Sequence, residues 1–298
     1  MDELMMICDQ GAALKELIRL LKLEKTEEDR FLGQSQDLGF GNVFGGQVLG
    51  QALSAATATT GMFLDAHSLH AYFLKAGNAA LPIEYRVERI RDGKSFATRR
   101  VTALQGEIPI FTMSCSFQKE ESGFTHQDPM PTDIPGPGGI ESETQILSRL
   151  APHIPESIRG KLLAPKPIEI RPVNPTDHLN PQPGEPVKYI WFKAAAPLPK
   201  DEGLHKALLA YASDFNLVDT ALCPHAKSFW SPDMQVASLD HSIWFHREFS
   251  MDDWLLYILR SPTASGARGL NIGAIYTRDG VRVASVAQEG LIRHRPRP

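Results

Sequence analysis

The chain has 298 residues, 42% hydrophobic and 22% charged, which is enough for one large domain or two of ordinary size with a sizeable core. A net charge of −4 argues against nucleic-acid binding. Three widely spaced cysteines, Cys8, Cys115 and Cys223, exclude a disulfide framework and suit a reducing compartment. The N-terminus lacks a signal-peptide pattern, and no stretch reaches the ~20 apolar residues of a membrane span. We therefore expect a cytoplasmic protein without a membrane span.

The first part of the chain predicts two helices followed by four strands. Leu14, Leu17, Ile18 and Leu21 mark one face of a helix over residues 12–23. The run "VFGGQVLGQALSAATAT" that begins at Val43 is small and apolar enough for a tightly packed helix. Alternating apolar and polar residues between turn signals then predict strands over residues 67–77, 82–93, 95–106 and 108–118.

A proline-rich connector follows, because 13 of the 22 prolines lie between Pro129 and Pro186. One short helix, Glu143 to Leu150, interrupts it. The remaining chain repeats the order of the first part. A strand over residues 187–194 precedes a helix containing "LLAYASDFNLVDTAL", and four strands follow, over residues 235–249, 253–261, 266–280 and 281–293.

Two similar modules are therefore predicted, and "HSLHAYFL" beside "HSIWFHRE" makes an internal duplication plausible. The predicted division is an N-terminal module over residues 1–122, a connector over 123–184 and a C-terminal module over 185–298. A long helix against an antiparallel sheet in each module is α+β architecture. Two unrelated α+β domains are the alternative.

Several familiar site signatures are absent. The chain has no G-x-S-x-G elbow, no phosphate-binding loop, no G-x-G-x-x-G and no paired C-x-x-C motifs. His67 and His70 are three apart on a predicted strand, so their rings point to opposite faces, and the same holds for His241 and His246. Core or hydrogen-bonded histidines are favoured over metal ligands, and neither a metal nor a cofactor is expected.

Two aspartates lie within the apolar run from 208 to 222. Leu208, Phe215 and Leu222 recur every seven residues and so share one helical face. Asp214 projects about 100° from that line, on its flank. Asp219, four residues after Phe215, lies nearer the middle of the face. Because burying a carboxylate without partners is costly, each could also cap a loop or pair with an arginine.

Gln288 and Ser238 are similarly ambiguous. Strand alternation places Gln288 on the face of Ala284 and Val286, where an amide either faces water at an edge or points into a pocket. Ser238 lies just before Asp240, and a serine there is ordinarily a local hydrogen-bonding residue.

A set of motifs in order along the chain carries a family resemblance. They are "FGGQVLGQAL", "HSLHAYFLKAG", "RDGKSFATRRV", "YASD", "SLDHSIWFHREF", "WLLY", "SGARG" and "DGVRVASVAQEGLIR". From about Leu14 to Arg293 the chain resembles the type II acyl-CoA thioesterases, the bacterial thioesterase II group and its peroxisomal relatives. The resemblance implies a double hotdog fold, in which each half is a long helix wrapped by an antiparallel sheet.

The resemblance also implies the site. Family members hydrolyse acyl-CoA with an aspartate, a glutamine and a threonine hydroxyl that orient a water. Carried over, these are Asp214 of "YASD", Gln288 of "VAQEG" and Ser238, where serine replaces the usual threonine and loses the methyl group that restricts χ1. Asp219 matches no catalytic position, which suggests a structural role or exposure at the helix end. The "FGGQ" turn at Gly45 and Gly46, where bare backbone can come close to a ligand, is a candidate oxyanion donor.

The substrate is then expected to be acyl-CoA, with its tail between helix and sheet. Lys94, Arg99, Arg100 and Arg268 are cations available for CoA phosphates, although a solvated strand face is their ordinary role. A double hotdog enoyl-CoA hydratase is the enzyme alternative, but its acid–base pair needs a histidine five residues after the aspartate, where Asp214 has Asp219. A non-catalytic acyl-CoA binding or sensing module is the other. The resemblance implies a homodimer or homotetramer.

Overall fold

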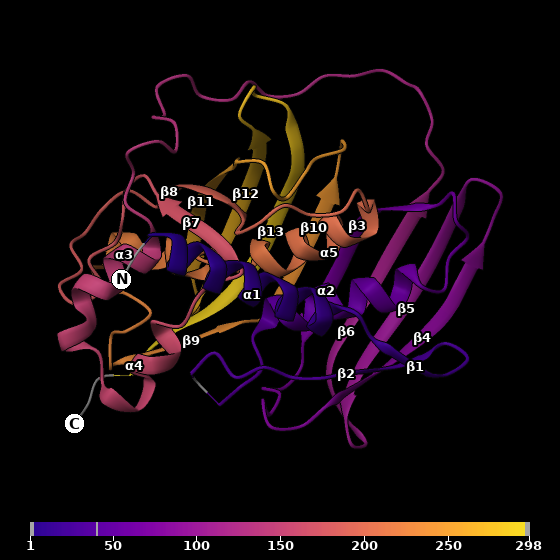
Figure 1. Cartoon of the computed structure of the whole chain (residues 1–298), viewed down its shortest axis with the longest axis horizontal. Coiled ribbons are helices and arrows are strands. Elements are labelled where there is room, and N and C mark those ends of the chain that lie inside the picture. Colours follow the sequence, from indigo (N-terminus) through magenta and orange to yellow (C-terminus); the bar gives the residue numbers. More distant parts are fainter. Residues whose placement is uncertain (1–2, 40, 296–298) are drawn as a thin grey trace.

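The structure is a computed structural model that describes residues 3–39 and 41–295. Its elements are shown in Figure 1. The helices are α1 (Glu3–Leu21), α2 (Gly45–Thr57), α3 (Glu143–Leu150), α4 (Glu156–Leu162) and α5 (Glu202–Ser213), with 3₁₀ turns η1 (Ala151–His153) and η2 (Val218–His225). The strands are β1 (Glu24–Glu27), β2 (Arg30–Gly33), β3 (Asp65–Phe73), β4 (Ile83–Asp92), β5 (Phe96–Gln105), β6 (Ile108–Gln118), β7 (Ile168–Pro172), β8 (Val187–Ala194), β9 (Met234–Ser238), β10 (Asp240–Phe245), β11 (Leu255–Ser265), β12 (Arg268–Thr277) and β13 (Arg282–His294).

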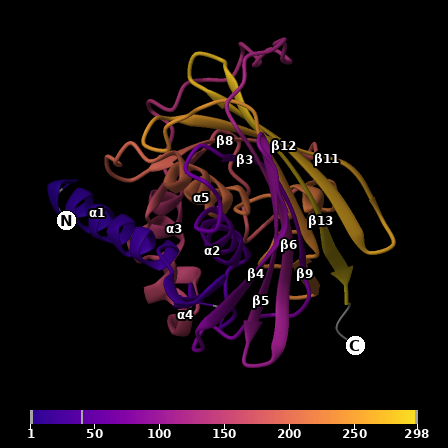
Figure 2. The same cartoon turned by 90° about the vertical axis from the view of Figure 1, so that its right-hand side faces the viewer.

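One antiparallel sheet runs through both halves of the chain. Its order is β1-β2-β4-β5-β6-β3-β10-β13-β12-β11-β8-β7, and β9 pairs with β13. The halves join where β3 pairs with β10, with Leu69 opposite Ile243. Viewed along its edge in Figure 2, the sheet is curved and the helices lie on one side of it. The predicted α+β class, with one helix against the sheet in each half, is confirmed.

The two helices α2 and α5 pack against each other on this face of the sheet. A β-carbon at Gly46 would lie 2.2 Å from the carbonyl oxygen of Tyr211, and one at Gly50 would lie 2.9 Å from that of Ala207. Only glycine therefore lets the backbones approach this closely. The approach brings the start of α2 beside the end of α5, where the two modules meet.

Most predicted elements lie where the pattern placed them. Strands β3 to β6, β8 and helix α3 match their predicted ranges within a few residues. The β1–β2 hairpin, α4 and β7 were not predicted. Strand β7 lies in the proline-rich connector and pairs only with β8, so it is an edge strand, where a terminal Pro172 is tolerated. The module boundaries themselves stay predictions.

The strand predicted over residues 235–249 is divided at Leu239. Strand β9 pairs with β13 alone, whereas β10 pairs with both β13 and β3. Leu239 donates its backbone N–H to Glu289 and accepts from the N–H of Phe73. The chain thus gains a second partner strand, β3, after Leu239, which a period-two pattern does not reveal.

The single helix predicted across residues 208–222 is wrong. Helix α5 ends at Ser213, Asp214 is its C-cap, and Asn216 adopts a left-handed conformation with φ of 62°. Asparagine is one of the few residues that tolerates this region, and it redirects the chain into η2. Leu208, Phe215 and Leu222 therefore share no helical face. Asp214 lies at a helix end and not on a flank.

Two further expectations concern cysteines and membranes. Cys115 and Cys223 are free thiols, and the side chain of Cys8 lies outside the described part of the chain. Among the described residues, no helix has the length and apolar character needed to cross a membrane.

Candidate active site

Asp214 and Gln288 meet although they are 74 residues apart in the chain. Gln288 lies on β13, where it alternates with partly exposed neighbours and shares a buried face with Ala284, Val286 and Gly290. Its Nε2 donates to Oδ1 of Asp214 at 2.7 Å. Strand alternation predicted this face correctly. Gln288 neither faces water nor lines a cavity: only 1% of the residue is exposed, and its amide is buried against Asp214.

The start of α2 faces the Asp214 carboxylate. The N-cap residue of α2, Phe44, makes no side-chain capping bond. The backbone N–H of Gly46 donates to Asp214. A β-carbon at Gly45 would lie 2.6 Å from Oδ2 of Asp214, so only glycine leaves room for the carboxylate. Asp214 thus caps the positive end of α2 from another helix, an arrangement that favours a negative charge. The Gly46 N–H of the predicted oxyanion turn is therefore directed at Asp214.

The surroundings of Asp214 shift its pKa in opposite directions. Burial of the carboxyl raises its pKa above the ordinary value of 3.8, and this effect is the largest. Hydrogen bonds from Gln288, the Gly46 backbone and the Ser238 hydroxyl lower the pKa, without cancelling the rise. A carboxyl with a raised pKa can take up a proton more readily than a solvated one.

Ser238 completes the predicted group. It is the last residue of β9 and lies opposite Gly290 of β13, two residues beyond Gln288. Asp214 and Ser238 both line one large cavity, and Gln288 is not among its lining residues. The three predicted site residues are therefore together, with Gln288 behind the carboxylate and Ser238 on the cavity side.

His241 belongs to the same cluster, and the sequence analysis did not place it there. Its ring is fully buried, with Nδ1 2.9 Å from Nε2 of Gln288 and Nε2 2.9 Å from Oγ of Ser213. His241 was predicted to be a core or hydrogen-bonded histidine, which is correct. A signal was available, because His241 shares the inward face of β10 with Ile243 and Phe245 and is the polar residue among them.

The cavity beside Asp214 has a volume of about 800 Å³, within the range of small-molecule sites. Its wall combines α2, the turn after β3, α5 and the connector. The apolar part of that wall includes Phe44, Phe73, Phe111, Ile146, Leu162, Ile168 and Ile190. The proline-rich connector therefore also forms part of the cavity wall.

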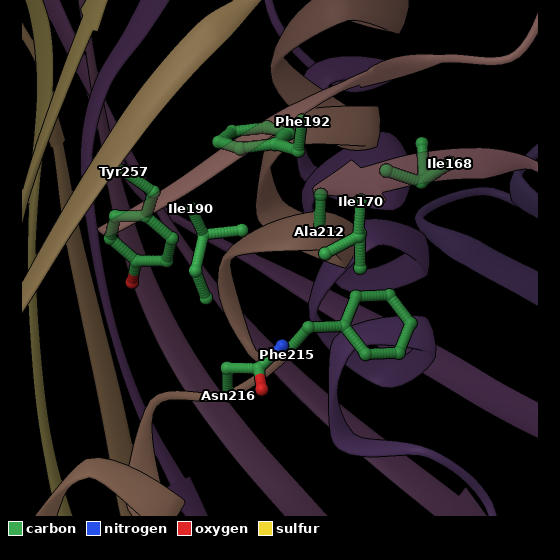
Figure 3. Close-up of a pocket in the computed structure, with 8 residues that line it drawn as sticks. All are labelled: Ile168, Ile170, Ile190, Phe192, Ala212, Phe215, Asn216 and Tyr257. Atoms are coloured by element: carbon green, nitrogen blue, oxygen red, sulfur yellow. The ribbon is translucent and has the colours of Figure 1, made fainter. Parts of the chain in front are cut away.

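A second, much smaller apolar cavity of about 10 Å³ lies beside Phe215 (Figure 3). In the figure Phe215 and Asn216, from the turn after α5, lie below the strand residues Ile170 and Ile190. Ile168, Ile170, Ile190, Phe215 and Asn216 line both cavities. Phe215 also stacks on Phe44, with ring centroids 4.5 Å apart. The residue after Asp214 thus forms part of the wall between the two cavities.

The four cations considered for CoA phosphates do not line the large cavity. Arg99 is only 1% exposed and bonds to Thr59 and Asp92, so for Arg99 the reading of a solvated strand face is wrong. Arg268 pairs with Glu289 on the neighbouring strand. The cavity wall instead carries Lys75, Lys161, Lys166 and Lys188.

The contacts of Asp219 are those of a residue that stabilises the fold. It is 7% exposed and pairs with the equally buried Lys188 of β8, and its Oδ1 accepts the backbone N–H of Phe229 at 3.1 Å. The two alternatives kept for such an aspartate were capping a loop and pairing with a cation. Asp219 does both, with a lysine in place of the expected arginine.

Histidines and acidic groups do not assemble into a metal site in the described part of the chain. His67 bonds to Ser116 and His70 to Ser242, as expected for hydrogen-bonded histidines on a sheet.

Comparison with known proteins identifies the family. A family model described as acyl-CoA thioesterase matches residues 165–291, and one described as the acyl-CoA thioesterase N-terminal domain matches residues 35–118. Acyl-CoA thioesterase 2 of Haemophilus influenzae is 44% identical over 280 residues, which are 94% of this chain and 98% of that protein. The chain belongs to the type II acyl-CoA thioesterase family.

Solved structures agree with this thioesterase assignment. An acyl-CoA thioesterase II from Mycobacterium marinum superposes with a TM-score of 0.76 at 39% identity, covering 93% of this chain and 98% of that one. A protein of Alicyclobacillus acidocaldarius described as having a hot dog fold gives a TM-score of 0.76 at 17% identity, covering 94% and 99% of the two chains. That likeness concerns the fold alone. The predicted double hotdog fold is confirmed.

Proposed function

We propose that this thioesterase hydrolyses fatty acyl-CoA to a fatty acid and CoA by direct attack of a water that Asp214 activates. The observation that carries the proposal is a buried carboxylate in the wall of a large apolar cavity. The side chain of Asp214 is 6% exposed, and its Oδ1 is held by Gln288. Oδ2 lies on the Gly45 side, and Gly45 lines the cavity. Asp214 lines the cavity as well, so we infer that its carboxylate accepts the proton from water.

The reaction needs only this base and a positioned water. As the water oxygen bonds to the thioester carbonyl carbon, Asp214 takes one water proton. Collapse of the tetrahedral intermediate then breaks the C–S bond, and the thiolate of CoA leaves and takes that proton. A thiol pKa of about 8.5 makes this thiolate a good leaving group. Ser238, on the cavity side, contributes its hydroxyl to holding the water, whereas Gln288 holds Asp214.

The cavity supplies a place for the acyl tail. Phe44, Phe73 and Phe111 offer an apolar wall next to Asp214, so a tail lying there brings its thioester to the carboxylate. The proposal includes a cytoplasmic homodimer or homotetramer, as the family resemblance implies. Sedimentation of the purified chain measures the oligomeric state.

Two assays test the chemistry. Saturated and enoyl acyl-CoAs are incubated with the protein, and free thiol and enoyl absorbance are followed together. Thiol release supports the thioesterase, absorbance loss without thiol would indicate a hydratase, and saturable binding without either would indicate a sensor. A single turnover in H₂¹⁸O then tests the covalent route. Direct attack places ¹⁸O in the fatty acid and none in Asp214, whereas an acyl-aspartate that water opens at the aspartyl carbonyl would leave ¹⁸O in the protein, so label in Asp214 would contradict direct attack.

The rate should depend on the ionisation of Asp214. Since a general base must be deprotonated, kcat/KM is expected to fall as the pH drops through the Asp214 pKa, above the ordinary 3.8. Ser238→Ala removes a hydrogen bond that lowers this pKa. It should therefore move the acid limb, the low-pH side of the curve of kcat/KM against pH, to higher pH. Ser238→Thr keeps the hydroxyl and should retain the wild-type limb. Identical limbs in the alanine variant and the wild type would contradict the role of Ser238.

A further inference from the structure

His241 makes a hydrogen bond through each of its two ring nitrogens. The bonds run to Ser213 at the end of α5 and to Gln288 on β13, so the ring connects the helix and the strand that hold the site. The imidazole is fully buried, and burial lowers the pKa of His241 to about 3. The ring is therefore neutral near pH 7 and carries a single proton.

The serine contact determines which nitrogen carries that proton. Ser213 has one hydroxyl hydrogen, which it donates to the carbonyl oxygen of Ala210 at 3.0 Å. That carbonyl oxygen can only accept, so the hydroxyl hydrogen is committed. The 2.9 Å contact between Ser213 Oγ and His241 Nε2 must then be a bond that Nε2–H donates. Nδ1 is left with a lone pair.

The histidine lone pair in turn determines the direction of the Gln288 amide. Nδ1 of His241 and ionised Oδ1 of Asp214 are two acceptors only 3.7 Å apart. The amide nitrogen of Gln288 donates to both, at 2.9 Å and 2.7 Å. A reversed amide would turn its oxygen toward two acceptors and lose both bonds.

We propose that His241 is a positioning residue that fixes the Gln288 amide so that it donates to Oδ1 of Asp214. The inference rests on the proposed role of Asp214 as the general base. Gln288 donates to both Asp214 and His241. The donation continues from His241 to Ser213, and from Ser213 to the Ala210 carbonyl in α5. This amide orientation leaves one buried polar atom unsatisfied, because Oε1 of Gln288 has no hydrogen-bond partner among the described residues.

The groups around Asp214 are uncharged at pH 7. The hydrogen bond from Gln288 therefore has a direct effect on the pKa of the Asp214 carboxyl. Uncharged donors face the carboxylate from α2, β9 and β13, namely the Gly46 N–H, Ser238 and Gln288. The titratable side chains near Asp214 include His241, Tyr211 and Tyr257, and burial raises the pKa of both tyrosines above the ordinary 10. All three are uncharged at pH 7. Loss of the Gln288 bond should therefore appear directly in the acid limb of the rate profile.

Three variants of His241 separate positioning from packing. His241→Asn keeps an acceptor at the position of Nδ1, His241→Gln places its polar atoms near Nε2 instead, and His241→Leu removes both. A matched control is His67→Leu, which removes another histidine–serine bond on the sheet but lies outside the cavity wall. Steady-state kinetics across pH and thermal unfolding are measured for each, with Asp214→Asn as reference.

The leucine and glutamine variants are expected to lose about tenfold or more in kcat with little change in KM, because a misplaced base costs turnover. Their acid limbs should shift upward by about one pH unit, the worth of one charge-assisted hydrogen bond. The asparagine variant should keep most of the wild-type kcat and its acid limb, even where its unfolding temperature falls. His67→Leu should keep both.

Wild-type kcat and acid limb in His241→Leu would overturn the inference, and so would equal losses in the asparagine and leucine variants. A normal turnover in Asp214→Asn would instead remove the proposed mechanism. If the variants fail to fold, ¹⁵N shifts of histidine-labelled wild-type protein decide, since the proposal requires the Nε2–H tautomer of His241. Observation of the Nδ1–H tautomer or of an imidazolium at pH 7 would overturn it.

Discussion

Replacement of Asp214 by asparagine is expected to lower kcat by at least about a hundredfold, because general-base catalysis contributes about 10²–10⁴ in rate. Asparagine has the same shape, and its Oδ1 can still accept from Gln288. It has no basic oxygen to take a proton from water. KM for acyl-CoA should change little, since the apolar wall of the cavity is untouched. Thiol release under saturating substrate measures the effect, and near-normal turnover would contradict the assignment.

The same variant should fold at least as stably as the wild type at pH 7. Burial raises the pKa of Asp214 in the folded state above 3.8, so the folded chain binds this proton more tightly than the unfolded chain. The stability from this proton is fully present below the unfolded pKa and is lost as the pH rises through the folded one. At pH 7 the ionised carboxylate therefore destabilises the fold. Asparagine removes that effect, and its advantage in urea denaturation should disappear near pH 4.

Strand parity was the most informative sequence signal for this fold. It placed Gln288 on the inward face with Ala284 and Val286, and the alternating runs matched β3 to β6. Parity reports only which face a side chain occupies, not what it meets across the core. The contacts of His241 with Ser213 and Gln288 join α5, β10 and β13 through packing of distant segments. A single sequence read by periodicity contains no such information.

Helical periodicity failed at the site because it assumed that the helix continues. The left-handed turn at Asn216 ends the regular helical geometry. Leu208 and Leu222, although spaced by a multiple of seven residues, therefore do not lie on one helical face. The motif "YASD" selected Asp214 in spite of this, because a motif match does not depend on the helix boundary. The structure supplies the reason for the position: a helix C-cap can bring its carboxylate to the start of another helix.

Asp219 and Lys188 form the buried ion pair for which the largest stability effect is expected. Their side chains are 9% and 5% exposed, and Asp219 joins η2 to β8 while accepting the N–H of Phe229. Removal of one partner leaves a buried charge uncompensated. Lys188→Met is therefore expected to reduce the free energy of unfolding by about 3–5 kcal/mol, as measured by urea denaturation.

The control for this prediction is a pair in solvent. Glu141 and Arg149 are 41% and 63% exposed, so Glu141→Gln should leave unfolding almost unchanged. A double variant, Lys188→Met with Asp219→Leu, removes both charges and should recover most of the lost stability, because two apolar side chains need no partner. An additive loss in the double variant would show that packing, and not the unpaired charge, causes the effect.

Asp219→Asn, compared with Asp214→Asn, then separates the two aspartates of the same sequence run. Asp219→Asn leaves Lys188 without its counter-charge and should reduce stability, while kcat stays within a few-fold of the wild type at a temperature where the variant is folded. Asp214→Asn should instead lower kcat and leave the stability at least as high as in the wild type. Each carboxylate is buried and each lines the cavity, so burial alone does not distinguish them. The partners do: Asp219 pairs with a buried cation, whereas the hydrogen-bond donors to Asp214 are uncharged.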